Sequence, residues 1–168
     1  FGCRILFYSV DYDPKVAQSA EFADLDTLYA ESDIITFHLP LLPATKHMIN
    51  RDSLKKLKKG VILINTARGE LFETEALIEG IESCKIGSLA MDVFEGEDGI
   101  YHVDLTDDIV RNRDMAYLRQ FPNVVLTQHM AFYTQLSMDS MIENSVQGMA
   151  ALQKLQQAFS DKQDEIKY

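Results

Sequence analysis

Four consecutive apolar residues, Val61-Ile62-Leu63-Ile64, restrict the fold of this chain more than any other feature of its sequence. A strand with one face in water alternates apolar and polar residues, and this run does not alternate. Strands of this kind are buried on both faces, as in parallel sheets that carry helices. The run therefore predicts a parallel sheet in an α/β fold.

Strand-like and helix-like segments alternate on either side of this run. Helical segments of about ten to fifteen residues between strands imply right-handed βαβ crossovers. We therefore expect a doubly wound, Rossmann-like parallel sheet. The predicted strands are residues 4–10, 34–37, 61–64, 89–93 and 124–126, and the predicted helices are residues 16–22, 25–29, 53–59, 74–81 and 115–118.

From Thr134 onward, a stripe of mainly apolar residues at three-to-four spacing replaces this alternation and predicts one long amphipathic helix. We favour core packing as the role of the stripe over partner binding, because methionines mostly fill gaps in cores. Polar residues 160–168 predict a frayed end. The stripe comprises Met138, Met141, Ile142, Ser145, Met149, Leu152 and Phe159.

The composition argues against several classes of partner. A net charge of -10 repels a phosphate backbone, so we expect no nucleic acid. No run approaches the roughly 20 apolar residues of a membrane-spanning helix, so we expect no membrane partner. Cys3 and Cys84 form no closely spaced metal pair. We expect no metal, two buried free thiols and a cytoplasmic location.

Polar residues follow four of the predicted strands at the point where each strand ends. Ligands of open parallel sheets bind beyond these carboxyl ends. Taken singly, such residues are ordinary surface or packing residues. Together they favour a single site. The segments are residues 38–40, 65–69, 92–97 and 127–133.

Three ordered motifs in these segments resemble signatures of the D-isomer-specific 2-hydroxyacid dehydrogenases. The resemblance implies an oxidoreductase that transfers a hydride between a nicotinamide cofactor and a 2-keto or D-2-hydroxy acid. An alternative function on the same fold is that of a dinucleotide-sensing, corepressor-like binding protein. The motifs are Asn65-Thr66-Ala67-Arg68-Gly69, then Ala90-Met91-Asp92-Val93-Phe94-Glu95-Gly96-Glu97, and then His129 followed by Ala131-Phe132-Tyr133-Thr134.

The resemblance assigns the catalytic roles to three residues. It implies that Arg68 holds the substrate, that His129 is the general acid and base, and that Glu97 is the partner of His129. A planar guanidinium can bind a carboxylate through two hydrogen bonds. An imidazole can both give and take a proton near neutral pH, and a carboxylate partner fixes its tautomer.

The cofactor is expected along the same strand ends. Asp92 resembles the position that contacts the nicotinamide amide. The predicted cofactor-binding residues are Ser9, His38, Pro40, Thr66 and Asp92.

The first predicted strand bears on the choice between NAD and NADP. Ser9 stands where NAD-preferring members usually place an acid that binds the adenosine ribose. Asp11 or Asp13 could replace that acid, whereas Ser9 alone tolerates a 2′-phosphate, with Arg4 and Lys15 as the nearby cations. We expect NAD and keep NADP as the alternative.

The loop after the third motif and the loop after Glu97 bear on the substrate. Phe132 resembles an aromatic wall against the substrate side chain, and simple packing is the alternative role. Residues 96–101, followed by a polar insertion that runs to Arg113, resemble the lactate branch of the family. Pyruvate and D-lactate are therefore the expected substrate pair.

The resemblance also implies how this chain relates to a longer protein. No G-x-G-x-x-G motif occurs in the sequence, and the family carries this motif just upstream of the position of Phe1. We expect residues 1–133 to be a partial dinucleotide-binding domain, and residues 134–168 to form a helix that packs towards a substrate domain outside this chain. The resemblance implies a homodimer for the full-length protein.

Overall fold

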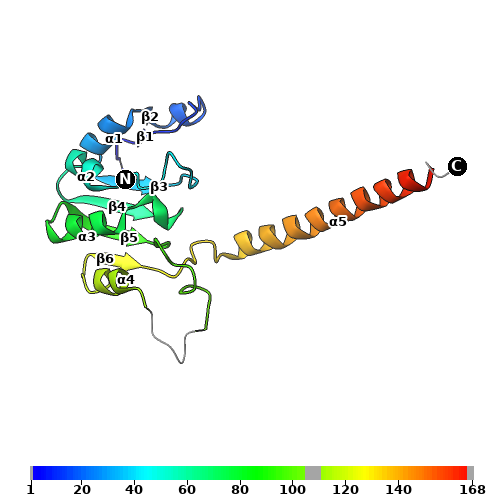
Figure 1. Ribbon diagram of the computed structural model, residues 1–168. Coiled ribbons are helices and arrows are strands. Elements are labelled where there is room, and N and C mark those ends of the chain that lie inside the picture. The colour runs from blue at the N-terminus through cyan, green and yellow to red at the C-terminus, as the bar shows by residue number, and fades with distance from the viewer. Residues whose placement is uncertain (1, 105–110, 166–168) are drawn as a thin grey trace. The chain divides into compact units, whose positions relative to one another are not determined.

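The computed structural model describes residues 2–104 and 111–165, with side chains described as far as Gln157 (Figure 1). It contains two compact units, Phe1–His129 and Met130–Tyr168. Each unit is described by itself below.

A four-stranded parallel sheet forms the centre of the first unit. Its strands follow the chain in the order β3-β4-β5-β6. The register pairs Phe37 with Asn65 and Asn65 with Met91, so neighbouring strands end at the same edge. The predicted parallel α/β fold is confirmed. The strands are β3 (Ile34–Phe37), β4 (Val61–Asn65), β5 (Ile86–Met91) and β6 (Val124–Leu126).

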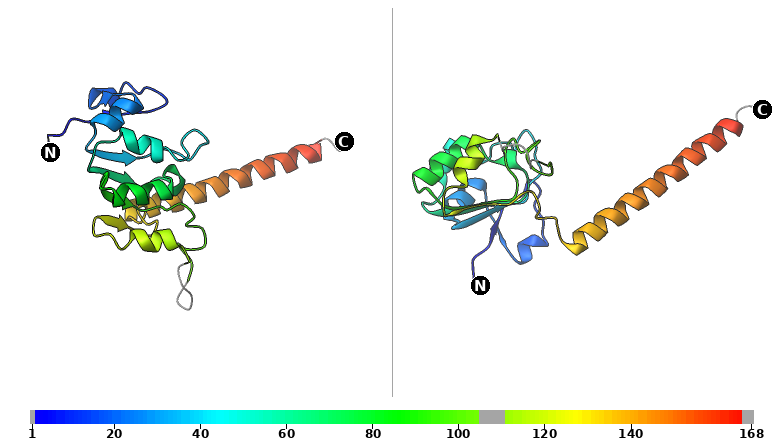
Figure 2. Two further views of the ribbon diagram at one scale, coloured as in Figure 1. Left: turned by 60° about the vertical axis from the view of Figure 1, so that its left-hand side comes forward. Right: turned by 90° about the horizontal axis from the view of Figure 1, so that it is seen from below.

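Four helices pack in series on one face of this sheet (Figure 2). Because the strand order runs in one direction, right-handed crossovers place the connecting helices on the same side. Within this unit, Ile34 and Val125 on the other face are 58% and 59% exposed. The helices are α1 (Leu25–Glu31), α2 (Arg51–Lys56), α3 (Thr74–Glu82) and α4 (Arg113–Leu118).

The core lies between the sheet and these helices. Val61, Leu63 and Asn65 point into it and are at most 1% exposed, whereas Ile62 and Ile64 on the other face are half-buried. The apolar run therefore supplies side chains to both faces of β4. The predicted burial is complete on one face and partial on the other. Other fully buried core side chains are Phe72, Leu77, Leu89, Met115 and Leu118.

The helix predicted at residues 16–22 is wrong. A single 3-10 turn, η1 (Val16–Gln18), is followed by a strand, β2 (Glu21–Phe22), which pairs in parallel with β1 (Leu6–Phe7) in a separate two-stranded sheet. The reason is the hydrogen bond from Glu21 N to Ile5 O, at 2.9 Å, and the edge-to-face packing of Phe22 on Phe7. These tertiary contacts outweigh the local helical pattern.

Local capping explains why helix α2 begins earlier than its apolar pattern. The side chain of Asn50 accepts hydrogen bonds from the backbone N–H groups of Asp52 and Ser53. In turn, the hydroxyl of Ser53 accepts a hydrogen bond from the backbone N–H of Asn50. This reciprocal cap satisfies donors that the first turn leaves unpaired. The helix therefore starts at Arg51, two residues before the predicted start.

The predicted burial of both cysteines is also wrong, because Cys3 and Cys84 are exposed free thiols. Cys84 lies just beyond α3 in a left-handed conformation, with φ of 56°, at the turn that leads into β5. A turn at the surface exposes a side chain that a strand of the sheet would bury.

The second unit contains the predicted long helix, α5 (Gln135–Glu165). The predicted frayed end falls partly on this helix, and its last residues, 166–168, lie outside the described residues. The core packing predicted for the stripe is not met within this chain, because Met141, Ile142, Met149 and Leu152 are 47 to 63% exposed. No helix among the described residues has the length and apolarity that crossing a membrane requires.

Truncation of Leu63 tests the position of the core. Leu63 is fully buried in β4, so we expect Leu63→Ala to lower the free energy of unfolding by about 2–5 kcal/mol. The exposed Ile34 in neighbouring β3 is the matched control, and Ile34→Ala should cost less than about 1 kcal/mol. Urea unfolding of both variants measures the difference, and equal losses would contradict the described burial.

Candidate active site

Three polar segments leave the sheet at one edge. Arg68 follows β4, Asp92 follows β5 and His129 follows β6, and these three strands are neighbours in the sheet. Because the strands are parallel, their carboxyl ends share the edge at which α/β sheets bind ligands.

Asn65 fixes the loop that carries Arg68. Its fully buried side chain donates to Arg68 O at 2.9 Å and accepts from Ala67 N at 3.0 Å. The loop is thereby closed before a single 3-10 turn, η2 (Gly69–Leu71), whose last residue Leu71 is fully buried. Arg68 itself remains exposed, with its guanidinium donating to Ala67 O at 2.6 Å. The sequence motif contains Asn65, but we assigned it no role.

Glu97 and His129 form a hydrogen-bonded pair across 32 positions of sequence. His129 Nδ1 lies 2.5 Å from Glu97 Oε1, and the two side chains are 33% and 20% exposed. The other carboxylate oxygen, Oε2, accepts from the backbone N–H of Phe94 at 2.5 Å. With both oxygens engaged, the carboxylate has one orientation, and that orientation sets the orientation of the imidazole.

The backbone of His129 is held as well as its ring. His129 N donates to Asp92 O at 2.7 Å, and His129 adopts a left-handed conformation with φ of 51°. Such a conformation is uncommon outside glycine and persists where the surroundings determine it. Asp92 is 4% exposed, and its carboxylate accepts a short hydrogen bond from the hydroxyl of Thr127.

One aromatic neighbour of His129 was missed by the sequence analysis. The imidazole of His102 packs at a tilt against the ring of His129, with centroids 5.7 Å apart. The only available signal was an unassigned histidine in the loop after Glu97.

A cavity of about 490 Å³ opens between the ends of β3 and β4. It brings together His38, Pro40, Thr66 and Arg68 from the predicted residues. Its lining combines an apolar wall with a hydroxyl and a guanidinium, as small-molecule sites commonly do. The lining residues are His38, Leu39, Pro40, Leu41, Thr66, Ala67 and Arg68.

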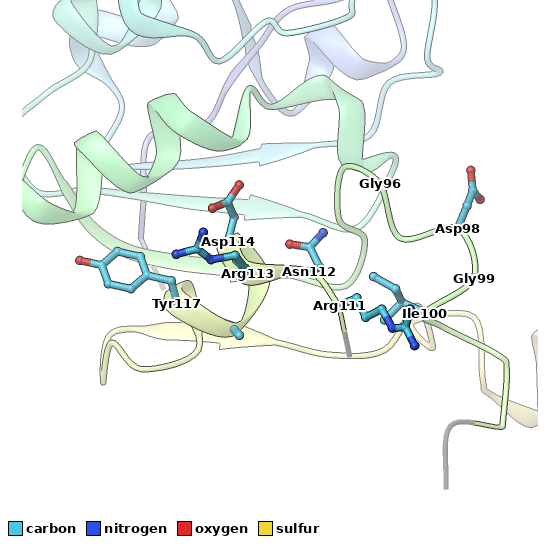
Figure 3. Close-up of a pocket in the computed structure, with 10 residues that line it drawn as sticks. Gly96, Asp98, Gly99, Ile100, Arg111, Asn112, Arg113, Asp114 and Tyr117 are labelled. Atoms are coloured by element: carbon cyan, nitrogen blue, oxygen red, sulfur yellow. The ribbon is translucent and has the colours of Figure 1, made fainter. Parts of the chain in front are cut away.

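A larger cavity, of about 1010 Å³, lies beside the loop after Gly96 (Figure 3). Its labelled residues come from this loop, from the two positions before α4 and from α4 itself, and they include charges of both signs. Neither Glu97 nor His129 lines it. The polar insertion predicted to run to Arg113 borders this cavity, and residues 105–110 of the insertion lie outside the described residues.

The other predicted residues are Ser9 and Phe132. Ser9 follows β1 in the two-stranded sheet and does not line the cavity at β3 and β4. Phe132 belongs to the second unit, where its ring contacts Tyr133 at a centroid distance of 5.8 Å. Their roles stay predictions.

Arg4, a candidate cation for NADP, is engaged elsewhere. Its guanidinium binds Glu21 at 2.8 Å and Glu31 at 2.6 Å. The hydrogen bonds that Arg4 donates to Glu21, and then those to Glu31, raise the pKa of Arg4. Arg4 therefore already has two carboxylate partners.

Comparison with known proteins places the chain among one group of enzymes. Residues 1–131 match the family model for the NAD binding domain of D-isomer specific 2-hydroxyacid dehydrogenases. An aromatic 2-oxoacid reductase of Clostridium sporogenes is 42% identical over 144 residues, which cover 85% of this chain and 44% of that protein. A D-lactate dehydrogenase of Lactobacillus delbrueckii subsp. bulgaricus is 39% identical over 143 residues, 84% of this chain and 43% of that protein.

Solved structures agree with the sequence relatives. The crystal structure of D-lactate dehydrogenase with NAD+ from Lactobacillus jensenii superposes with a TM-score of 0.84 at 38% identity, over 90% of this chain and 46% of that one. The chain thus spans less than half the length of these relatives.

The hydrogen bonds of Asn65 predict a local effect on the Arg68 loop. Asn65→Ala leaves Ala67 N and Arg68 O without these partners, so we expect the free energy of unfolding to fall by about 1–3 kcal/mol. Amide hydrogen exchange at Ala67 should accelerate. Asn144→Ala, at an exposed position of α5, is the control and should change stability by less than about 0.5 kcal/mol. Unchanged exchange at Ala67 in Asn65→Ala would refute this role.

Proposed function

The chain belongs to the family of D-isomer-specific 2-hydroxyacid dehydrogenases, and we propose that the protein containing it reduces a 2-oxo acid to the D-2-hydroxy acid with NADH. The observation that carries the proposal is the Glu97–His129 pair, at the sheet edge where Arg68 also emerges. A positioned acid–base pair at the same sheet edge as an arginine suits the reduction of a ketone that carries a carboxylate.

His129 is the proposed proton donor. In the reduction, the bound nicotinamide supplies the hydride that reaches the carbonyl carbon. Glu97 binds Nδ1 of His129, which leaves Nε2 as the ring nitrogen that gives a proton to the carbonyl oxygen. In the reverse direction the same nitrogen takes the proton back, and the carboxylate of Glu97 stabilises the imidazolium.

Arg68 is the proposed substrate clamp. A guanidinium can hold a carboxylate through two parallel hydrogen bonds, and this orients the adjacent carbonyl. The buried side chain of Asn65 restricts the loop of Arg68, so less freedom is lost when substrate binds. We also propose that Asp92 contacts the nicotinamide amide and that His38, Pro40 and Thr66 line the cofactor site.

NAD is the proposed cofactor in preference to NADP. The matching family model describes an NAD binding domain. The ion pairs of Arg4 with Glu21 and Glu31 support the choice, because a cation bound by two carboxylates attracts a 2′-phosphate less. The homodimer and the cytoplasmic location remain predictions.

Steady-state turnover by the full-length protein tests the activity. We expect the protein to oxidise NADH when pyruvate is the substrate. Oxidation of NADPH with the same substrate should be slower. Phenylpyruvate is the parallel substrate, because one relative is named as an aromatic 2-oxoacid reductase. No turnover with any 2-oxo acid would refute the proposed function, and preference for phenylpyruvate would shift the substrate class.

Substitutions of His129 and Arg68 should affect different kinetic constants. We expect His129→Gln to lower kcat by about 10²–10⁴-fold, because the proton donor acts in the bond-making step. Arg68→Gln should lower kcat/KM for the 2-oxo acid by about tenfold or more, since it removes the charged hydrogen-bond donor of the substrate carboxylate. NADH binding measured by fluorescence is the control for His129→Gln and should persist in that variant. Undiminished kcat in His129→Gln would contradict the assignment.

A further inference from the structure

Glu95 makes three hydrogen bonds and has no role in the proposed mechanism. Its Oε1 lies 2.6 Å from His47 Nε2. Its Oε2 accepts from the hydroxyl of Thr74 at 2.9 Å and from Thr74 N at 3.2 Å. The side chain is 29% exposed, so these bonds are partly shielded from water.

The first partner of Glu95 is itself fixed by the backbone around it. His47 adopts a left-handed conformation with φ of 53°. Its N–H donates to Glu70 O at 2.8 Å, and its carbonyl accepts from the side chain of Asn50 at 2.9 Å. The backbone of His47 is therefore held in place, and its imidazole binds Glu95 from this position.

The second partner is the first residue of α3. The residue before that helix, Glu73, makes no side-chain cap, and Glu95 accepts the N–H of Thr74 in its place. A carboxylate at this end also meets the positive end of the helix dipole. Glu95 thus joins the turn after β5 to the helix that follows the Arg68 loop.

The turn that carries Glu95 also carries Glu97. Phe94 N donates to Glu97 Oε2 and Glu97 N donates to Phe94 O at 3.2 Å, so residues 94–97 form a closed turn. Gly69 lies directly against this turn, where an added Cβ would come within 2.1 Å of the carbonyl carbon of Phe94 and 2.4 Å of Glu95 N. The turn is therefore in contact with the backbone of Gly69, and the hydrogen bonds of Glu95 hold it to His47 and Thr74.

We propose that Glu95 is a positioning residue, which holds the 94–97 turn against His47 and α3 and thereby sets the orientation of Glu97 and His129. This role rests on the proposed function, since it acts through the general acid. Burial alone raises the pKa of Glu95, but the hydrogen bonds from His47 and Thr74 together lower it. The carboxylate is therefore charged at neutral pH, when it binds these partners most strongly.

A double-mutant cycle in the full-length protein tests this role. In the wild-type background, Glu95→Ala should lower kcat about ten- to hundred-fold, as expected for loss of a supporting hydrogen-bonded group, with the KM for NADH unchanged. In a Glu97→Gln background the same change should lower kcat by less than about threefold, because the group that it positions is already disabled. Equal losses in both backgrounds would overturn the proposal.

Arg51→Ala is the matched control for general destabilisation. Arg51 forms ion pairs with Glu73, Glu75 and Glu79 of α3 and its approach, and it does not contact the 94–97 turn in any described interaction. It should lower the midpoint of thermal unfolding and leave kcat within about twofold. If Glu95→Ala does not fold, His47→Ala decides, because it removes one hydrogen bond and leaves the turn sequence intact. Unchanged kcat in a folded His47→Ala would overturn the proposal.

A spectroscopic measurement separates this proposal from the proposed function. The proton shared by His129 and Glu97 should give a downfield NMR signal that disappears in Glu97→Gln. Glu95→Ala, or His47→Ala in its place, should shift or broaden that signal, and Arg51→Ala should not. An undisturbed signal would overturn the positioning role even if the wild-type protein reduces no 2-oxo acid, whereas absent turnover alone would overturn only the function.

Discussion

The parallel pairing of β4 with β3 on one side and β5 on the other is the constraint on which the rest of the structure depends. Because Asn65 aligns with both Phe37 and Met91, the three strands end together. The residues that follow them then leave the sheet along a common edge. A shift of register by one residue would turn the inward side chains of β4 to the other face and separate these exits.

Most helices and strands of the fold were predictable because local hydrophobic patterns determine them. The strand at residues 34–37 and the strand at residues 124–126 were predicted with the boundaries that the structure gives. The N-terminal segment was not, because β2 depends on pairing with a strand 15 positions away, from Leu6 to Glu21, and on aromatic contacts with Phe7. Neither is visible in a window of neighbouring residues.

The main residues of the candidate site were predictable from the sequence. The contacts that hold these residues in place were much less predictable. A resemblance of motifs suggested Arg68, Glu97 and His129, and the structure shows the contact between the last two. The supporting contacts of Asn65, His47 and Thr74 join residues of ordinary types at unremarkable spacings. Only the three-dimensional arrangement shows that their side chains converge on the loops that carry the site.

The double use of the Glu97 carboxylate affects how substitutions at this position can be interpreted. One oxygen faces an imidazole and the other holds the backbone N–H of Phe94, so truncating this side chain to alanine also leaves an amide without its acceptor. A weaker enzyme with Glu97 replaced would then mix a chemical deficit with a distorted loop. Rate measurements on Glu97→Ala therefore report chemistry cleanly only when a crystal structure of the variant shows the 94–97 turn unchanged, whereas Glu97→Gln keeps an oxygen that can accept a hydrogen bond.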